Sequence, residues 1–363
     1  MTGSDIVTPP IVPVVLCGGS GARLWPLSTD ARPKPFLPLL DGRSTFQETL
    51  ARAGAIEGVD TVLIVANQSN RDLIKAETDG SAFAVQLLLE PVGRDSAAAI
   101  AAAAAWLARH RPGVVAAFMS ADHHVPDRDA FAAAIAGAAR AALDHGVVAL
   151  GLRPDGPSTA FGYIRPLPDG GAVARIGAFV EKPDRDTAER YIAAGYLWNS
   201  GNFVARPEAL LAELTIQAPE IAAAASSAVA AAVAEPGATL LGPEFSQSPS
   251  ISIDRALMER TTEAAVLPVG FAWSDIGSWR AVLSASPRDD AMNSLNGDVV
   301  MEGCTGCIVR MPPGIRVAMV GLKDIAIIAN ETGDLLVCDL AAGEDVRNVV
   351  RRLQTASRST GKP

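Results

Sequence analysis

The first 150 residues alternate short apolar runs with longer segments of helical character. The apolar runs are rich in Val, Ile, Leu and Ala, and they are Ile11–Leu16, Thr61–Val65, Val85–Leu89, Val114–Met119 and Val147–Leu150. The helices expected between them are Thr45–Arg52, Asp95–Arg109 and Asp129–Asp144. Such alternation is typical of βαβ units, so the pattern predicts an α/β fold with a mostly parallel sheet.

The pattern changes twice further along the chain. From about Arg153 the segments become short strands with Gly and Pro turns, followed by predicted helices at Asp186–Ala194 and Pro207–Glu235. Beyond Pro287 the chain is β-rich, with expected strands at Asp298–Met301, Cys307–Met311, Ile315–Val320, Ile325–Asn330 and Leu335–Asp339, before a last helix at Gly343–Leu353. We therefore predict two domains, 1–287 and 288–363.

Composition narrows the class of protein. The chain has 363 residues, 49% of them hydrophobic, and a net charge of −9, which argues against a nucleic-acid binder but not against binding of a single nucleotide. Its alanine-rich runs favour helices rather than membrane spans, and Met1–Pro10 lacks the features of a signal peptide. A cytoplasmic protein with no membrane partner is expected, and a homo-oligomer is compatible with the sequence.

The cysteines predict neither a disulfide framework nor a metal site. Cys304 and Cys307 are spaced as C-x-x-C, but Cys17 and Cys338 do not form a second pair that could complete a zinc site. We interpret Cys304 and Cys307 as buried thiols in a β-rich segment.

A glycine-rich loop follows the first predicted strand. Its glycines let the backbone approach a ligand closely, and two nearby cations, Arg23 and Lys34, add positive charge. The loop residues are Gly18, Gly19, Ser20, Gly21 and Ala22. No Lys stands where a P-loop requires one, and Leu24 occupies the third glycine position of a dinucleotide fingerprint. The remaining interpretation is a loop that binds a polyphosphate.

An aspartate stands at another strand end, where ligands of open α/β sheets bind. Asp122 comes shortly after the apolar run that ends at Met119, and it is placed either to hold a divalent cation or to cap a turn. The adjacent His123 and His124 have no further histidines to support a transition-metal site. Asp122 is therefore a candidate ligand for Mg²⁺.

Two stretches together resemble a known family. Gly18–Ser28, which ends in Trp-Pro-Leu-Ser, and Lys34–Leu37 resemble the signature of sugar-1-phosphate nucleotidylyltransferases, and in particular the mannose-1-phosphate guanylyltransferase branch. The resemblance extends from Ile11 to about Leu353. It implies a Rossmann-like nucleotidyltransferase domain and a small C-terminal domain similar to a left-handed β-helix.

The resemblance also implies roles for single residues. Asp275, between aromatic residues and before Gly277, resembles the second metal-binding aspartate, so Asp122 and Asp275 would hold Mg²⁺. Arg23, Lys34 and Lys182 would be catalytic, with Lys182 on the phosphate of the sugar. The sugar-binding residues would be Gly162, Tyr163, Glu181 and Asn199, and the base would be bound by Glu90, Gly93 and Arg94. The family more commonly has Arg-Asn-Thr where this chain has Arg94-Asp95-Ser96, both of which supply a helix N-cap.

The expected reaction is transfer of GMP from GTP to α-D-mannose 1-phosphate, with Mg²⁺ and without a covalent intermediate. Two alternatives remain open at this point. The chain could use another nucleoside triphosphate or another hexose 1-phosphate, because one or two polar contacts decide such preferences. It could also be a regulatory subunit that binds a nucleotide sugar without turnover, although such a sensor would not need all of Arg23, Lys34, Asp122, Lys182 and Asp275.

Overall fold

The computed structural model of the protein describes residues 8–19, 21–40, 42–168 and 170–360, with side chains up to residue 355. The chain divides into two compact units that are each built from several segments. Unit 1 comprises residues 1–18, 49–121 and 125–273, and unit 2 comprises residues 19–48, 122–124 and 274–363. Within the described ranges, no helix combines the length and apolarity needed to cross a bilayer.

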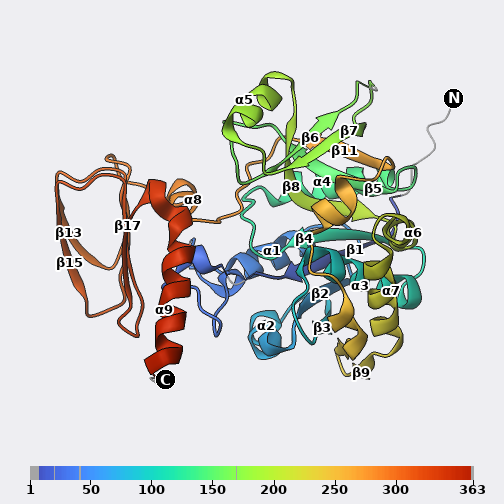
Figure 1. Ribbon diagram of the computed structural model, residues 1–363, viewed down its shortest axis with the longest axis horizontal. Helices are drawn as coiled ribbons and strands as arrows, with labels where there is room; N and C mark the ends of the chain where they lie inside the picture. The colour runs from blue at the N-terminus through green and yellow to red at the C-terminus, as the bar shows by residue number, and fades with distance from the viewer. Residues whose placement is uncertain (1–7, 20, 41, 169, 361–363) are drawn as a thin grey trace. The chain divides into compact units, whose positions relative to one another are not determined.

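Unit 1 is organised around an 11-stranded sheet in the order β5-β11-β7-β6-β8-β4-β1-β2-β3-β10-β9 (Figure 1). Its strands are β1 (Ile11–Cys17), β2 (Thr61–Asn67), β3 (Ala84–Glu90), β4 (Val115–Ser120), β5 (Val147–Leu152), β6 (Gly162–Pro166), β7 (Ala174–Glu181), β8 (Leu197–Ala205), β9 (Val233–Glu235), β10 (Ala238–Leu240) and β11 (Ala264–Val269). The central strands β4, β1, β2, β3 and β10 pair in parallel, as expected for βαβ units.

The sheet is mixed rather than mostly parallel, which corrects the prediction. β6 pairs antiparallel with both β7 and β8, and β8 also runs antiparallel to β4 and β5. β6 and β7 follow each other across a short connection, and neighbouring strands joined in this way must run in opposite directions. The short strands after Arg153 are recognisable in the sequence, but their pairing direction is not.

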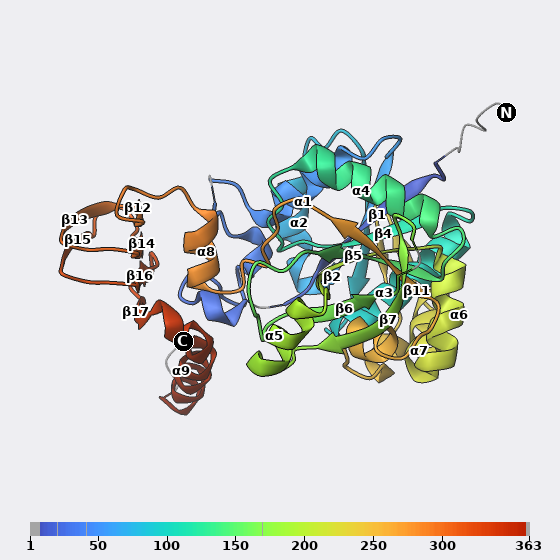
Figure 2. The same cartoon turned by 90° about the horizontal axis from the view of Figure 1, so that it is seen from above.

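Helices cover both faces of this sheet (Figure 2). The helices of unit 1 and the border helix α1 are α1 (Thr45–Gly54), α2 (Arg71–Thr78), α3 (Asp95–His110), α4 (Arg128–Ala141), α5 (Arg185–Ala193), α6 (Pro207–Gln217) and α7 (Pro219–Ala230). Figure 2 shows α4 on one side of the sheet and α6 and α7 on the other. The alanines from Ala97 to Ala104 in α3 are buried in the main core with α6 and α7. Small side chains on α3 let these helices pack closely, so the alanine-rich run is a core helix.

The structure differs from the predicted elements at one long helix and at two elements that were not predicted. The segment Pro207–Glu235, expected to be one helix, forms two helices, α6 and α7. The short strand β9 follows α7. Pro219 disfavours helical geometry at Ala218 and starts a new helix at its first position. The apolar strand β11 and the helix α2 are further elements that the sequence analysis does not predict.

Unit 2 contains the β-rich C-terminal region. Its strands are β12 (Ser294–Asn296), β13 (Asp298–Glu302), β14 (Ile308–Arg310), β15 (Arg316–Val320), β16 (Ile325–Ala329) and β17 (Leu335–Asp339). β12, β14 and β16 pair in parallel, β17 adds antiparallel to β16, and β13 pairs in parallel with β15. The β-rich character is as expected, while the left-handed helical winding stays a prediction. Cys304 and Cys307 are buried and free, which confirms their interpretation as thiols in the core.

The units do not coincide with the predicted cut at residue 287. The N-terminal segment from Gly19 to Glu48 belongs to unit 2, together with α8 (Trp279–Ala285), the 3-10 segment η6 (Leu340–Asp345) and α9 (Val346–Thr360). These segments share one core, in which Leu24, Leu37 and Leu40 pack with Trp279 and Val346. Such packing between distant segments leaves no local periodicity, so the sequence could not predict it. The last helix also extends beyond the predicted Leu353, and it follows η6 instead of starting at Gly343.

Candidate active site

The glycine loop begins directly after the buried strand β1. Gly19 and Gly21 both have left-handed backbone geometry, with φ of 82° and 65°. A Cβ atom at Gly21 would lie 2.4 Å from the Cβ of Lys34, so only glycine fits there. Ala22–Leu24 then form a 3-10 turn, η1, while the predicted loop residue Ser20 lies outside the described residues. The loop thus brings its backbone close to Lys34.

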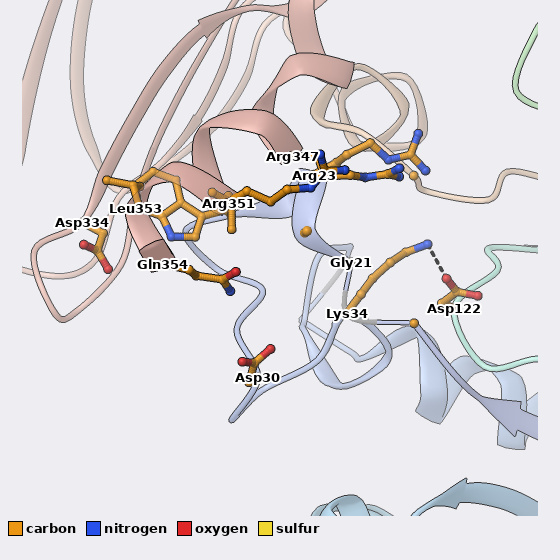
Figure 3. A pocket seen from close by; sticks show the side chains of 15 residues that line it. Gly21, Arg23, Asp30, Lys34, Asp122, Asp334, Arg347, Arg351, Leu353 and Gln354 are labelled. Carbon is orange, nitrogen blue, oxygen red and sulfur yellow. Dashed lines mark hydrogen bonds and ion pairs between the residues drawn. The ribbon is translucent and has the colours of Figure 1, made fainter. Parts of the chain in front are cut away.

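A cavity of about 1050 Å³ in unit 2 opens beside this loop (Figure 3). It is lined by several of the predicted residues and by the C-terminal helix: Gly19, Gly21, Ala22, Arg23, Trp25, Asp30, Lys34, Asp122, Gly277, Asp334, Arg347, Val350, Arg351, Leu353 and Gln354. Two predicted residues are not part of the lining. Gly18 directly precedes the lining residue Gly19, and the carbonyl of Asp275 accepts a hydrogen bond from the lining residue Lys34. The contribution of α9 to this lining is not predictable from the sequence, because that helix is distant in the chain from the glycine loop and carries no motif.

Lys34 joins the two predicted metal ligands. Its side chain is buried, 5% exposed for the residue as a whole, and its Nζ lies 2.6 Å from Oδ2 of Asp122. The same ammonium donates a hydrogen bond to the backbone carbonyl of Asp275. Lys34 occupies a 3-10 turn, η2 (Lys34–Phe36), which Pro33 precedes in extended geometry. A single cation therefore holds together the segments that carry both aspartates.

A short backbone bridge holds the same two segments. The amide of His124 donates to the carbonyl of Ser274 at 2.9 Å, and the amide of Ser274 donates to the carbonyl of His124 at 3.0 Å. This antiparallel bridge lies two residues after Asp122 and one residue before Asp275. His124 thus contributes its backbone to the site architecture.

The residues present fit a magnesium ion that also binds a phosphate. Within the described residues, no group of three or more His, Cys, Asp and Glu side chains could hold a metal. Mg²⁺, however, commonly uses one or two carboxylates and completes its octahedral shell with water and substrate phosphates. Asp275 Oδ1 accepts from the amide of Gly277 at 3.2 Å, and a Cβ at Gly277 would lie 2.4 Å from Asp275 Oδ2. Hard oxygen donors on Asp122 and Asp275 suit that chemistry.

Arg23 already has a carboxylate partner. Its guanidinium forms an ion pair and hydrogen bond with Glu344 in the 3-10 segment η6. Arg23 also approaches Gly277, whose Cβ would come within 3.0 Å of the Arg23 Nη2. The predicted phosphate-binding arginine is therefore held between the glycine loop and the C-terminal part of unit 2.

In unit 1, three predicted sugar-binding residues lie side by side on neighbouring strands. Gly162 on β6 pairs with Glu181 at the end of β7, and the register of β6 with β8 brings Asn199 beside Gly162. A Cβ at Gly162 would lie only 2.7 Å from Glu181 Oε2, so the glycine makes room for that carboxylate. Lys182 follows β7 with a left-handed φ of 50°, and its ammonium pairs with Glu181. The sheet thus gathers Gly162, Glu181, Lys182 and Asn199.

Tyr163 differs from this group because its side chain serves the fold. The residue is fully buried, and its hydroxyl accepts from the amide of Ser158 at 3.0 Å and donates to the carbonyl of the same residue at 3.1 Å. The phenol is already hydrogen-bonded within the protein. A sugar contact by Tyr163 stays a prediction.

Two acids beside this group are absent from the predicted site. Asp254 Oδ1 accepts a hydrogen bond from Asn199 Nδ2 at 2.9 Å, and Glu259 Oε1 accepts from the amide of Glu181 at 3.1 Å. Burial raises the pKa of Asp254 to about 6, with the nearby Glu181 carboxylate adding to the rise. Asp254 is the first residue of a π-helical turn, Asp254–Met258, and its side chain does not cap that turn. The sequence feature that could have indicated Asp254 is an acidic residue next to an apolar stretch, because a buried acid needs a polar partner.

The predicted base-binding segment lies at the end of β3. Glu90 is 8% exposed, and among the described residues its Oε1 has no hydrogen-bond partner. Burial raises the pKa of Glu90 to about 7. Burial of a carboxyl oxygen without a hydrogen bond raises the free energy of the folded protein. A ligand that supplies N–H donors would satisfy this oxygen.

The turn after Glu90 leads into α3. Gly93 is exposed, and the guanidinium of Arg94 donates to the carbonyl of Ser246. The expected N-cap differs in detail: Asp95 has a left-handed φ of 63°, and its Oδ1 accepts from the amide of Ser96 at 2.7 Å. The cap position itself is Arg94, which makes no capping bond through its side chain.

Comparisons with known proteins identify the family. A model of the nucleotidyl transferase family matches residues 12–291. The xanthan biosynthesis protein XanB of Xanthomonas campestris is 38% identical over 354 residues, which cover 96% of this chain and 74% of that protein. A mannose-1-phosphate guanylyltransferase of Klebsiella pneumoniae is 35% identical over 361 residues, covering 97% and 76%.

A solved structure agrees with these relatives. It is the crystal structure of a Thermus thermophilus protein titled mannose-1-phosphate geranyltransferase, which is 34% identical. It covers 95% of this chain and 99% of that one, with a TM-score of 0.84. The resemblance predicted from the glycine loop is thereby confirmed, and this chain belongs to the nucleotidyl transferase family of enzymes.

Proposed function

We propose that the protein transfers GMP from GTP to α-D-mannose 1-phosphate, which gives GDP-mannose and pyrophosphate. The geometry that carries this proposal is the contact of Lys34 with both Asp122 and Asp275 beneath a glycine loop. That arrangement suits a triphosphate with a bound divalent cation. Relatives named mannose-1-phosphate guanylyltransferase over nearly the whole chain support the choice of substrates.

The reaction would be a direct displacement. An oxygen of the sugar phosphate forms a bond to the α-phosphorus of GTP, while the bond from that phosphorus to the α,β-bridging oxygen breaks. Pyrophosphate leaves with the electron pair of the broken bond. A sugar phosphate carries a negative charge at neutral pH, so its attack needs no general base. Positioning and charge stabilisation would supply the catalysis.

Different residues would bind the triphosphate, the sugar phosphate, the metal ion and the base. Arg23 and Lys34 would bind the triphosphate, and Lys182 would bind the phosphate of mannose 1-phosphate. Asp122 and Asp275 would hold Mg²⁺, which supplies neutralisation of the phosphate charge when it is bound. Glu181 and Asn199 would orient the sugar hydroxyls. The buried carboxyl of Glu90 would accept hydrogen bonds from N–H groups of guanine.

The test is release of pyrophosphate by the purified protein with Mg²⁺, mannose 1-phosphate and each nucleoside triphosphate in turn. We expect release with GTP, and a loss of about a hundredfold or more in kcat for Arg23→Ala, because a contact that strengthens in the transition state contributes about 3 kcal/mol. Release with a different triphosphate alone would overturn the guanine assignment. No release from folded protein with any triphosphate would overturn the enzyme assignment in favour of a regulatory subunit.

A further inference from the structure

The C-terminal helix α9 presents two arginines to the cavity of unit 2. Its Val346 and Val350, one turn apart, are buried in the core that also holds Leu24 and Trp279. Arg347 and Arg351 follow these valines by one position each, so they lie one above the other along the helix. Both line the cavity beside the glycine loop. The apolar anchor therefore fixes which side of α9 faces the loop.

Among the residues that the structure describes, these two arginines are the cavity cations without an acidic partner. Arg23 is paired with Glu344, and Lys34 is paired with Asp122. Within the described part of the chain, neither the Arg347 nor the Arg351 guanidinium forms an ion pair or side-chain hydrogen bond. Figure 3 shows the side chains of Arg23, Arg347 and Arg351 gathered near Gly21, whereas Asp30 and Asp334 lie farther away.

Such a cluster is suited to an anion with several charges. Guanidinium groups crowded together repel one another, and an anion between them relieves that repulsion. Arginine also presents a planar set of donors that matches the oxygens of a phosphate. The neighbouring glycine loop and the buried Lys34 indicate a chain of phosphates rather than a lone carboxylate.

We propose that Arg347 and Arg351 bind the β- and γ-phosphates of the nucleoside triphosphate and the pyrophosphate that they become. This inference rests on the proposed function for the identity of the nucleotide. The β,γ end carries most of the charge of a triphosphate, and two exposed arginines on a helix offer that charge a site from which pyrophosphate can leave. The C-terminal helix is thereby part of the substrate site.

The chain offers a matched control on the same helix. Arg352 is exposed and adjacent to Arg351, but it does not line the cavity. Arg347→Ala, Arg351→Ala and the double variant can therefore be compared with Arg352→Ala, which removes the same charge as each single variant. All three arginines are exposed, and thermal unfolding of each variant reports whether the fold is retained.

The experiment is calorimetric titration of each protein with inorganic pyrophosphate in the presence of Mg²⁺, alongside the KM for GTP. We expect each single variant to bind pyrophosphate about tenfold more weakly and the double variant more weakly still, because charge-assisted hydrogen bonds are lost. The KM for GTP should rise in parallel, while the KM for mannose 1-phosphate and all constants of Arg352→Ala stay within about twofold of wild type.

The outcomes separate this inference from the proposed function. If the protein makes GDP-mannose but the double variant binds pyrophosphate and GTP like wild type, the inference is wrong and the proposed function stands. The inference is also wrong if Arg352→Ala weakens binding as much as the other two single variants. If no sugar nucleotide forms, yet the double variant loses pyrophosphate affinity and Arg352→Ala keeps it, the proposed function fails and the polyphosphate site stands.

Discussion

Glu90 is a buried carboxyl whose protonation should affect stability. Its pKa is about 7 in the folded protein because of burial, against an ordinary value of 4.5. As pH rises from about 4 to 8, the unfolded chain loses this proton first, so the free energy of unfolding falls by about 3 kcal/mol through this group. Glu90→Gln removes the effect, and its stability relative to wild type should rise by about that amount between pH 4 and pH 8.

Chemical denaturation of both proteins across this pH range measures the difference. Because other titrating groups are common to the two proteins, only the group at position 90 contributes to the change in the difference. A stability difference that stays constant with pH would show that Glu90 does not titrate as the burial implies.

Asp275 offers a second test with little disturbance of its surroundings. Lys34 contacts the backbone carbonyl of this residue, so Asp275→Asn keeps that hydrogen bond while it removes the carboxylate charge. If Asp275 holds Mg²⁺, the concentration of Mg²⁺ for half-maximal rate should rise about tenfold or more, because an amide is a poorer ligand for a hard cation. An unchanged Mg²⁺ titration would exclude Asp275 as a ligand.

At the level of elements, the π-helical turn Asp254–Met258 contacts the strands that carry the proposed sugar-binding residues. Asn199 donates one N–H to Asp254 and accepts from the amide of Gly201 at 3.0 Å, so its amide is fixed with a second N–H available. Asp254→Ala should therefore raise the KM for mannose 1-phosphate about tenfold and leave the KM for GTP unchanged. Arg255→Ala, exposed on the same turn, is the control. A rise in both KM values would indicate a general structural defect instead.

Element predictions succeed where local pattern decides structure. The strands from Ile11 to Leu150 and the helices α1, α3 and α4 between them are recognisable because apolar runs and alanine-rich segments carry their own periodicity, whereas the short helix α2 is not. The break at Pro219 is readable in principle, since proline disfavours helix in the residue before it. The antiparallel pairing of β8 is not, because pairing direction depends on which strands become neighbours in the sheet.

At the scale of the whole molecule, unit 2 is assembled from segments far apart in the chain. Trp279 is 1% exposed in its core, where Leu24 and Leu37 from the N-terminal segment also lie. Trp279→Ala should cost about 3–5 kcal/mol of stability through the cavity it leaves. Hydrogen exchange should then increase in residues 21–40 as well as in 274–355. An increase confined to the C-terminal segment would contradict the shared core.

Residues of the candidate site also differ in whether the sequence predicts them. Gly19, Gly21, Arg23, Lys34 and Asp122 are predictable because they carry a recognisable motif or follow a strand. Asp254, Glu344 and the arginines of α9 are not, because their roles depend on tertiary contacts with residues far away in sequence. A sequence motif identifies site residues that are close together in the chain, whereas site residues from distant segments are brought there by tertiary packing.

The chemical step at the centre of the proposed function is attack of a mannose 1-phosphate oxygen on the α-phosphorus of GTP. It is tested most directly with mannose 1-phosphate that carries ¹⁸O in its three non-bridging phosphate oxygens, followed by mass spectrometry of both products. We expect GDP-mannose that retains all three labels and pyrophosphate that contains none. Label in pyrophosphate, or the absence of any labelled sugar nucleotide from active protein, would contradict it.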